Sequence, residues 1–229
     1  MNKHRFVWHE LGTRDVEGAK KFYGEVFGWS FSAGKDDPYV HIAAGEEMIG
    51  GLRQMEANEP QPTSWLAYVA VDDVPATVDA IRGAGGTVLV PTTTMENVGT
   101  FAVAADPSGG VFAAWKSARP DEDVERPGMP APFTFAWDEL MSTDPASAGA
   151  FYAQVFGWTS RAVDMGGGMI YTLLDRPGVT TPKGDPGSAS TIATSAPPAP
   201  RSSARRSRCR RRTSRASAAS RCGPIRRAP

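Results

Sequence analysis

The chain has 229 residues, enough for one or two domains, and its 25 basic and 25 acidic side chains cancel. No apolar run is long enough to span a bilayer, and the N-terminus lacks the apolar core of a secretory signal. Both cysteines, Cys209 and Cys222, lie near the C-terminus, which excludes a disulfide framework or thiolate metal site elsewhere. These features predict a cytoplasmic protein without a membrane partner.

A repeated pattern organises the chain. Phe-x-Trp-x-Glu-Leu, followed by Phe-Tyr-x-x-Val-Phe-Gly-Trp, occurs over residues 6–29 and again over residues 135–158. The first copy continues as patterned sequence to about residue 116, whereas the second loses its pattern past about residue 178. The repeat predicts two units, with a boundary in the polar, Pro-rich stretch between them.

The first unit begins with a strand over residues 6–11, in which alternation puts Phe6, Trp8 and Glu10 on one face. An apolar stripe with 3.6-residue spacing then predicts a helix between Asp15 as N-cap and Gly28 as C-terminal stop. Three strands follow, over residues 29–33, 39–44 and 47–55. This succession is one βαβββ module.

A second βαβββ module follows in the same order. It has a strand over 65–71, a helix over 74–82, and strands over 87–90, 100–104 and 110–116. The predicted class is α+β, with paired modules. The predicted divisions are a domain over 1–116, a linker over 117–132, half of a second, truncated domain over 133–178, and a tail over 179–229.

The pattern resembles the glyoxalase/bleomycin-resistance/extradiol-dioxygenase family, also called the vicinal oxygen chelate superfamily. The matching residues are Asp15, Phe22-Tyr23, Val26-Phe27-Gly28-Trp29, Val71-Asp72-Asp73-Val74, Val98-Gly99 and Asp106-Pro107-Ser108-Gly109. The resemblance implies modules whose sheets curl around a cup. It also implies isomerase, lyase, dioxygenase or hydrolase activity or antibiotic binding, so it constrains function little.

Many members of that family bind a divalent metal through one His or Glu on the first and last strands of each module. The corresponding positions here are Trp8, Gly50 or Gly51, Leu66 and Ala113, and none of these side chains can bind a metal. We therefore predict no catalytic metal and no other cofactor in this cup.

Glu10 is the candidate catalytic residue. A carboxylate beside the Trp8 indole and away from bulk water would tend to hold its proton, which makes it a candidate general acid or base. The open alternative is a structural hydrogen-bond acceptor. The candidate ligand-binding residues are Trp8, Leu66, Tyr68, Ala113 and Trp115, for which ordinary core packing is the alternative. We expect a small organic ligand, bound and converted without metal, or else bound by a non-catalytic, antibiotic-type sequestering protein.

The composition of the C-terminal tail predicts disorder, because residues 186–229 contain no Leu, Val, Phe, Tyr, Trp or Met. Ala, Arg, Pro, Ser and Gly dominate shifted reading frames of GC-rich DNA. With free choice of codons, the tail read one base earlier can spell Gly-Val-Gly-Arg-Phe-Ala-Val, close to residues 98–103. We therefore hypothesise a frameshift between about residues 178 and 194.

A basic arm for nucleic acid is the rival interpretation of the tail. Eleven arginines and no acidic residue follow position 200, so residues 1–200 carry a net charge of −11. The tail has no aromatic side chain to stack on a base, so we expect no specific nucleic-acid partner. A truncated second domain would instead expose apolar surface and favour self-association.

Overall fold

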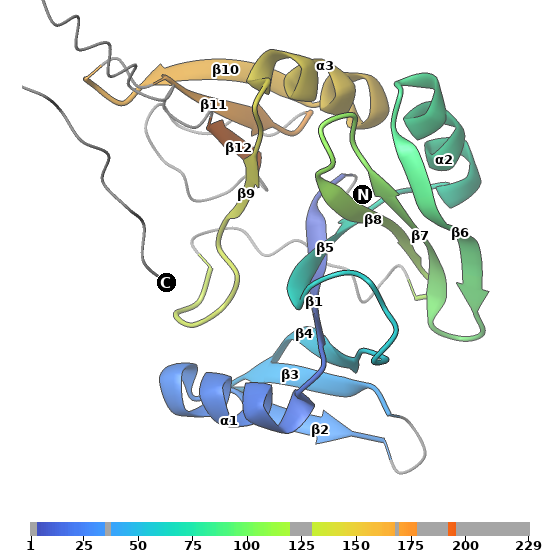
Figure 1. Ribbon diagram of the computed structural model, residues 1–229, viewed down its shortest axis with the longest axis vertical. Helices are drawn as coiled ribbons and strands as arrows, with labels where there is room; N and C mark the ends of the chain where they lie inside the picture. The colour runs from blue at the N-terminus through green and yellow to red at the C-terminus, as the bar shows by residue number, and fades with distance from the viewer. Residues whose placement is uncertain (1–3, 35–37, 120–129, 168–169, 178–191, 196–229) are drawn as a thin grey trace, which may run out of the picture. The chain divides into compact units, whose positions relative to one another are not determined.

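Residues 4–34, 38–119, 130–167, 170–177 and 192–195 are described by the computed structural model (Figure 1). The first module consists of β1 (Phe6–Thr13), α1 (Val16–Phe27), β2 (Ser30–Ala33), β3 (Val40–Ala44) and β4 (Glu47–Gln54). The second consists of β5 (Ser64–Ala70), α2 (Val74–Gly83), β6 (Thr87–Met95), β7 (Gly99–Ala105) and β8 (Val111–Ser117). No helix in the described part of the chain is long and apolar enough to cross a membrane.

The two modules share one eight-stranded sheet, in the order β2-β3-β4-β1-β5-β8-β7-β6. In each module the first strand pairs in parallel with the last, β1 with β4 and β5 with β8. The modules join at the centre of the sheet, where β1 and β5 are antiparallel. The predicted α+β class with paired βαβββ modules is therefore confirmed.

The chain then repeats the arrangement of the first module. The third module consists of β9 (Asp138–Met141), α3 (Pro145–Phe156), β10 (Thr159–Asp164), β11 (Ile170–Asp175) and β12 (Ile192–Ser195). Its sheet order, β10-β11-β12-β9, matches β2-β3-β4-β1, with β12 and β9 parallel as β4 and β1 are.

Strand β12 lies beyond the end at residue 178 that we predicted for this unit. The composition argument overlooked Ile192-Ala-Thr-Ser, a short segment with two β-branched residues that is suited to pairing in a sheet. The remainder of the predicted tail over 179–229, with its expected disorder and frameshift, lies outside the described residues, as does most of the linker. Truncation of the second domain stays a prediction.

Helices α1 and α3 begin and end in the same way because the repeat supplies the same capping residues. Asp15 accepts a hydrogen bond from Gly18 N at 2.8 Å, and Asp144 accepts one from Ser147 N at 3.1 Å. Each helix ends at a glycine in the left-handed conformation, Gly28 (φ 70°) or Gly157 (φ 69°). The N-cap at Asp15 and the stop at Gly28 were predicted from the sequence.

The first and third modules contact each other through equivalent residues. The indole N–H of Trp158 donates to the carbonyl of His4 at 3.1 Å, and that of Trp29 donates to the carbonyl of Phe133 at 2.7 Å. Trp158 stands 129 positions after Trp29, and Phe133 stands 129 positions after His4. The repeat thus produces a reciprocal contact, in which each module supplies both the donor and the acceptor.

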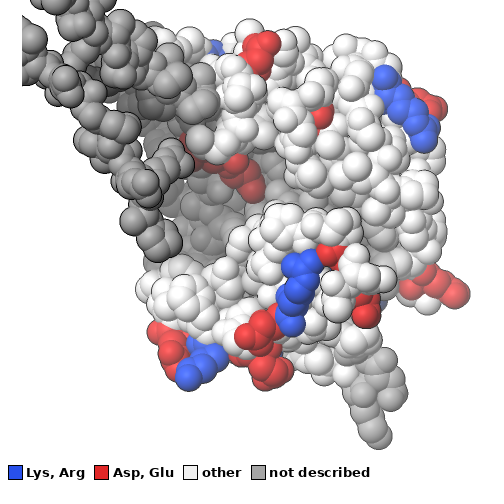
Figure 2. Space-filling view, in the orientation of Figure 1, with Lys and Arg blue, Asp and Glu red and all other residues white. Residues whose placement is uncertain are grey.

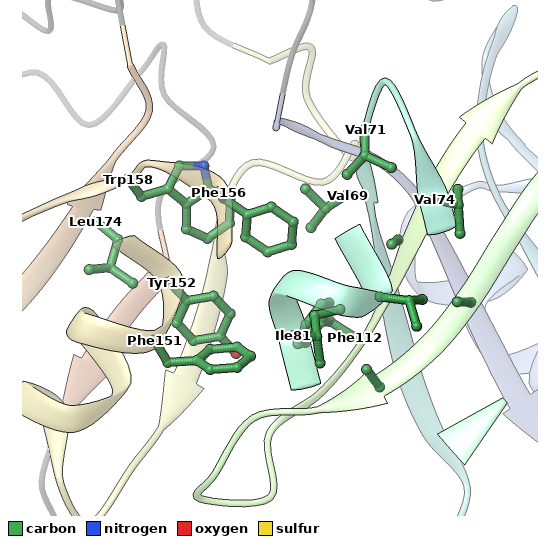
Figure 3. Close-up of a cluster of buried hydrophobic side chains, with 14 of the residues drawn as sticks. Val69, Val71, Val74, Ile81, Phe112, Phe151, Tyr152, Phe156, Trp158 and Leu174 are labelled. Carbon is green, nitrogen blue, oxygen red and sulfur yellow. The ribbon is translucent and has the colours of Figure 1, made fainter. Parts of the chain in front are cut away.

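The largest described core cluster joins the second module to the third (Figure 3). In Figure 3, side chains of α3, Trp158 and Leu174 lie on one side, facing valines, Ile81 and Phe112 of the second module. Its buried members are Val69, Val71, Val74, Val78, Ile81, Ala102, Ala104, Phe112, Ala114, Ala148, Phe151, Tyr152, Phe156, Trp158 and Leu174. Helix α3 is therefore part of the core of the second module.

Candidate functional site

The predicted site residues lie together on one face of three neighbouring strands. Trp8 is opposite Tyr68 in the β1–β5 pair, and Glu10 is opposite Leu66. In the β5–β8 pair, Tyr68 is opposite Ala113. Directly opposed residues project to the same face of a sheet, and alternation adds Trp115, whose ring lies 6.2 Å from that of Tyr68. We call this surface the cup face; it carries Trp8, Glu10, Leu66, Tyr68, Ala113 and Trp115.

Phe6 does not belong to the cup face, so its predicted position beside Trp8 and Glu10 was wrong. The pairing of β1 with β5 shifts between Phe6, opposite Val69, and Trp8, opposite Tyr68. Two residues on β1 thus advance by only one on β5, as in a β-bulge, which reverses the alternation. Phe6 consequently packs against the core cluster that contains Val69.

Glu10 is held by a phenol and a guanidinium. The Tyr68 hydroxyl donates to Glu10 Oε2 at 3.3 Å, and Arg53 Nε lies 3.5 Å from Glu10 Oε1. Only 13% of the Glu10 side chain is exposed. Arg53 is itself fixed by two hydrogen bonds to the Glu59 carboxylate, at 2.9 and 3.0 Å. These contacts fix the orientation of the Glu10 carboxylate before any ligand binds.

Two phenols beside Glu10 remain protonated at neutral pH. Burial raises the pKa of Tyr68, and the negative charge of Glu10 raises it further. Burial and then Glu10 raise the pKa of Tyr39 in the same way, against a smaller opposing effect from its hydrogen bond with Trp8. That bond runs from Trp8 Nε1 to Tyr39 Oη at 2.8 Å. Both phenols can therefore donate hydrogen bonds.

Sequence reasoning missed Tyr39, His41 and Arg53. His41 lies on β3, opposite Gly51 of β4. Its ring lies 6.1 Å from that of Trp8 and 5.3 Å from that of Tyr39, edge-on to each. Arg53 could have been found, because it stands two residues after Gly51 and so shares its face of β4. Tyr39 could have been found through the repeat, in which Tyr171 holds the equivalent register position.

The residues at the expected metal-ligand positions do not suit a metal. Trp8, Leu66 and Ala113 bring only an indole and apolar side chains to the cup face. A side chain at Gly51 would collide with the Tyr39 phenol, which occupies the space over that strand. Within the described ranges, no group of three or more His, Cys, Asp and Glu side chains could hold a metal ion. The donor set therefore does not match the site that the resemblance implies.

The third module repeats part of the site. Trp137 Nε1 donates to Tyr171 Oη at 3.1 Å, and Glu139 stands two residues after Trp137, as Glu10 does after Trp8. Burial raises the pKa of Tyr171, and the charge of Glu139 also raises it. In the register of the strands, Ser195 is equivalent to Arg53. Among the described residues, the position of Arg53 therefore provides no cation for Glu139.

Comparison with curated proteins finds two groups of relatives. CFP32 of Mycobacterium tuberculosis, provisionally named a glyoxylase, is 31% identical over 173 residues, covering 73% of this chain and 65% of that protein. The anthracycline biosynthesis protein DauV of Streptomyces sp. strain C5 is 28% identical over 167 residues, covering 66% of this chain and 60% of that protein. The chain thus spans slightly less than two thirds of the length of these relatives.

Solved structures support the fold. The 2,3-dioxygenase LapB of Pseudomonas sp. KL28 superposes with a TM-score of 0.56 at 15% identity, over 87% of this chain and 73% of that chain. The Mn(II)-bound glyoxalase of Novosphingobium aromaticivorans superposes with a TM-score of 0.53 at 20% identity, over 86% and 62% of the two chains. The family model matches residues 5–113, and through these residues the chain belongs to the Glyoxalase/Bleomycin resistance protein/Dioxygenase superfamily.

Proposed function

We propose that the cup face binds a small, flat organic molecule and converts it without a metal, with Glu10 as general acid or base. The observation that carries this proposal is the placement of Glu10, which is 13% exposed and contacts Tyr68 and Arg53. A carboxylate oriented in this way is able to accept a proton from a ligand and return it.

The surroundings of Glu10 favour a ligand with an aromatic body and polar edges. Trp8 lies opposite Tyr68 and the Trp115 ring lies 6.2 Å from the Tyr68 ring, so both indoles offer ring surface on the cup face. The phenols of Tyr39 and Tyr68 stay protonated, because burial raises their pKa values, and the Tyr68 hydroxyl donates to Glu10. Arg53 balances the charge of Glu10. Aromatic walls around a few oriented polar groups are typical of sites for small organic molecules.

The relatives suggest which molecules to test first. DauV is named an anthracycline biosynthesis protein, and anthracyclines are flat polycyclic molecules with hydroxyl and carbonyl groups at their edges. We therefore propose polycyclic phenols and quinones as the ligand class. No step is assigned to a metal, because Trp8, Gly51, Leu66 and Ala113 supply no side-chain ligand atoms.

The test combines a thermal-shift screen of such molecules with assays of turnover. We expect a ligand that raises the melting temperature of the full chain, and loss of turnover in Glu10→Gln with the fold retained. Glu139→Gln is the matched control, because it makes the same change beside the equivalent Trp137 and should leave turnover unchanged. Unchanged turnover in Glu10→Gln would overturn the catalytic role.

A non-catalytic binding protein is the second candidate. It is favoured by the two hydrogen bonds between Arg53 and Glu59, which fix the cation beside Glu10 in place. Ligand held in stoichiometric amount without turnover would support this function and contradict catalysis. In either case, a stoichiometric divalent ion retained through dialysis would contradict the expected absence of a metal.

A further inference from the structure

Helix α1 exposes an apolar face that its repeat counterpart buries. Phe22 and Phe27 of α1 are 56% and 38% exposed, whereas the equivalent residues of α3, Phe151 and Phe156, are 3% and 1% exposed. Val26 of α1 is a further exposed apolar residue, at 51%. We call Phe22, Val26 and Phe27 the α1 patch.

The second module is what buries the equivalent face of α3. Helix α2 packs against α3, and the ring of Phe112 lies 6.1 Å from that of Phe151 and 5.6 Å from that of Phe156. The Tyr152 hydroxyl also donates to Asp106 Oδ2 at 3.0 Å. Among the described residues, no second module of this kind covers α1, so the α1 patch lacks the partner that α3 has.

The C-terminal segment and the second module are poorly suited to cover the α1 patch. Residues 196–229 contain no Leu, Val, Phe, Tyr, Trp or Met, so they offer little apolar surface. The second module already holds α3 of its own chain. A second copy offers the α1 patch itself, an exposed apolar surface of the same residues. We propose that two copies of the chain associate through α1, patch against patch.

The charges beside the patch favour an antiparallel pairing of the two helices. Lys21 and Glu25 are both exposed and lie one turn apart on the same flank of α1. A twofold axis perpendicular to the helices, passing near Tyr23, brings Lys21 of each copy opposite Glu25 of the other. In Figure 2, the lower left of the molecule, where Figure 1 places α1, combines uncharged surface with neighbouring acidic and basic side chains.

The first test measures the mass of the full chain by light scattering over a dilution series, under reducing conditions that exclude disulfides through Cys209 or Cys222. We expect a dimer that dissociates on dilution, and dissociation at about hundredfold higher concentration in Phe22→Glu. Val98→Glu is the matched control, because Val98 is 53% exposed outside α1 and its change should leave the dimer unaffected.

A second test exploits the twofold symmetry. Lys21→Glu and Glu25→Lys should each weaken the dimer by about tenfold, because each places like charges opposite each other twice. Mixing the two variants should restore dimers, since a mixed pair has opposite charges at both places. A chain that is monomeric at all concentrations, association that survives Phe22→Glu, or no recovery on mixing would overturn the proposal. These readouts are independent of ligand binding.

Discussion

Helices α1 and α3 carry the same Phe-Tyr-x-x-Val-Phe pattern with the same caps, and yet one is exposed where the other is buried. Phe22 and Phe151 make the contrast clearest, at 56% and 3% exposed. An apolar stripe indicates which face of a helix can be buried. Whether it is buried depends on the neighbouring module, which the stripe itself does not encode.

The first and third modules also differ in the surroundings of their equivalent carboxylates, Glu10 and Glu139. Glu10 lies at the centre of the eight-stranded sheet, where β5 supplies Tyr68 and β4 supplies Arg53. Glu139 lies on β9, at the edge of the described four-stranded sheet, with Ser195 in the position equivalent to Arg53. A local Trp–Tyr–Glu set therefore becomes a candidate site where Tyr68 of the second module and Arg53 of β4 complete it.

The largest expected effect comes from truncating the equivalent phenylalanines. Phe151→Ala should lower the free energy of unfolding by about 3–5 kcal/mol, because it opens a cavity between α3 and the second module. Phe22→Ala should change it by no more than about 0.5 kcal/mol in dilute solution, where the patch is exposed. Urea unfolding of both variants measures the difference.

Equal losses of stability in the two alanine variants at low protein concentration would contradict the claim that α1 exposes the face that α3 buries. A loss in Phe22→Ala that grows with protein concentration has a different meaning. Such a loss is expected from the proposed dimer, whose association stabilises the folded chain by mass action.

A smaller effect is expected from the equivalent tyrosines. Tyr152→Phe removes a hydrogen bond to the buried carboxylate of Asp106 and should cost about 1.5–3 kcal/mol. Tyr23→Phe removes the acceptor of the Trp65 indole N–H, at 3.2 Å, and should cost about 0.5–1.5 kcal/mol, because both groups of that bond are uncharged. Equal losses, measured by urea unfolding, would show that the buried carboxylate adds nothing.

Much of the fold was predictable because it depends on local signals. Asp15, Gly28 and the alternation along the strands fix where elements begin, end and face. The bulge between Phe6 and Trp8 was not predictable, because it is defined by pairing with β5, a strand more than fifty residues away. Strand β12 was missed because it is short and isolated within a polar segment.

The candidate site was predictable where it follows from alternation along one strand. Trp8 with Glu10, and Leu66 with Tyr68, share the cup face as expected. The contact of Arg53 with Glu10 depends on the neighbouring strand and on Glu59 beyond its end, so it required the structure. The frameshift hypothesis concerns residues outside the described part and stays a prediction, which the nucleotide sequence decides.

The smallest expected effect concerns stability in acid. It tests the role of Arg53, a residue of the first module whose position in the third module is held by Ser195. The hydrogen bonds from Arg53 lower the pKa of Glu59 from 4.5 to about 2. Because the pKa is lower in the folded chain, the ionised carboxylate stabilises the fold above about pH 4.5. This contribution disappears as the pH falls from 4.5 toward 2.

Glu59→Gln should therefore flatten the decline in the free energy of unfolding between about pH 4.5 and 2, as measured by urea unfolding at each pH. Glu17→Gln is the control, since Glu17 is 82% exposed and pairs with Lys20 on the surface of α1. It should retain the decline, because an exposed ion pair contributes little. An unchanged acid decline in Glu59→Gln would mean that the Arg53–Glu59 pair does not hold the cation beside Glu10 in solution. The site would then be no better oriented than its counterpart at Glu139.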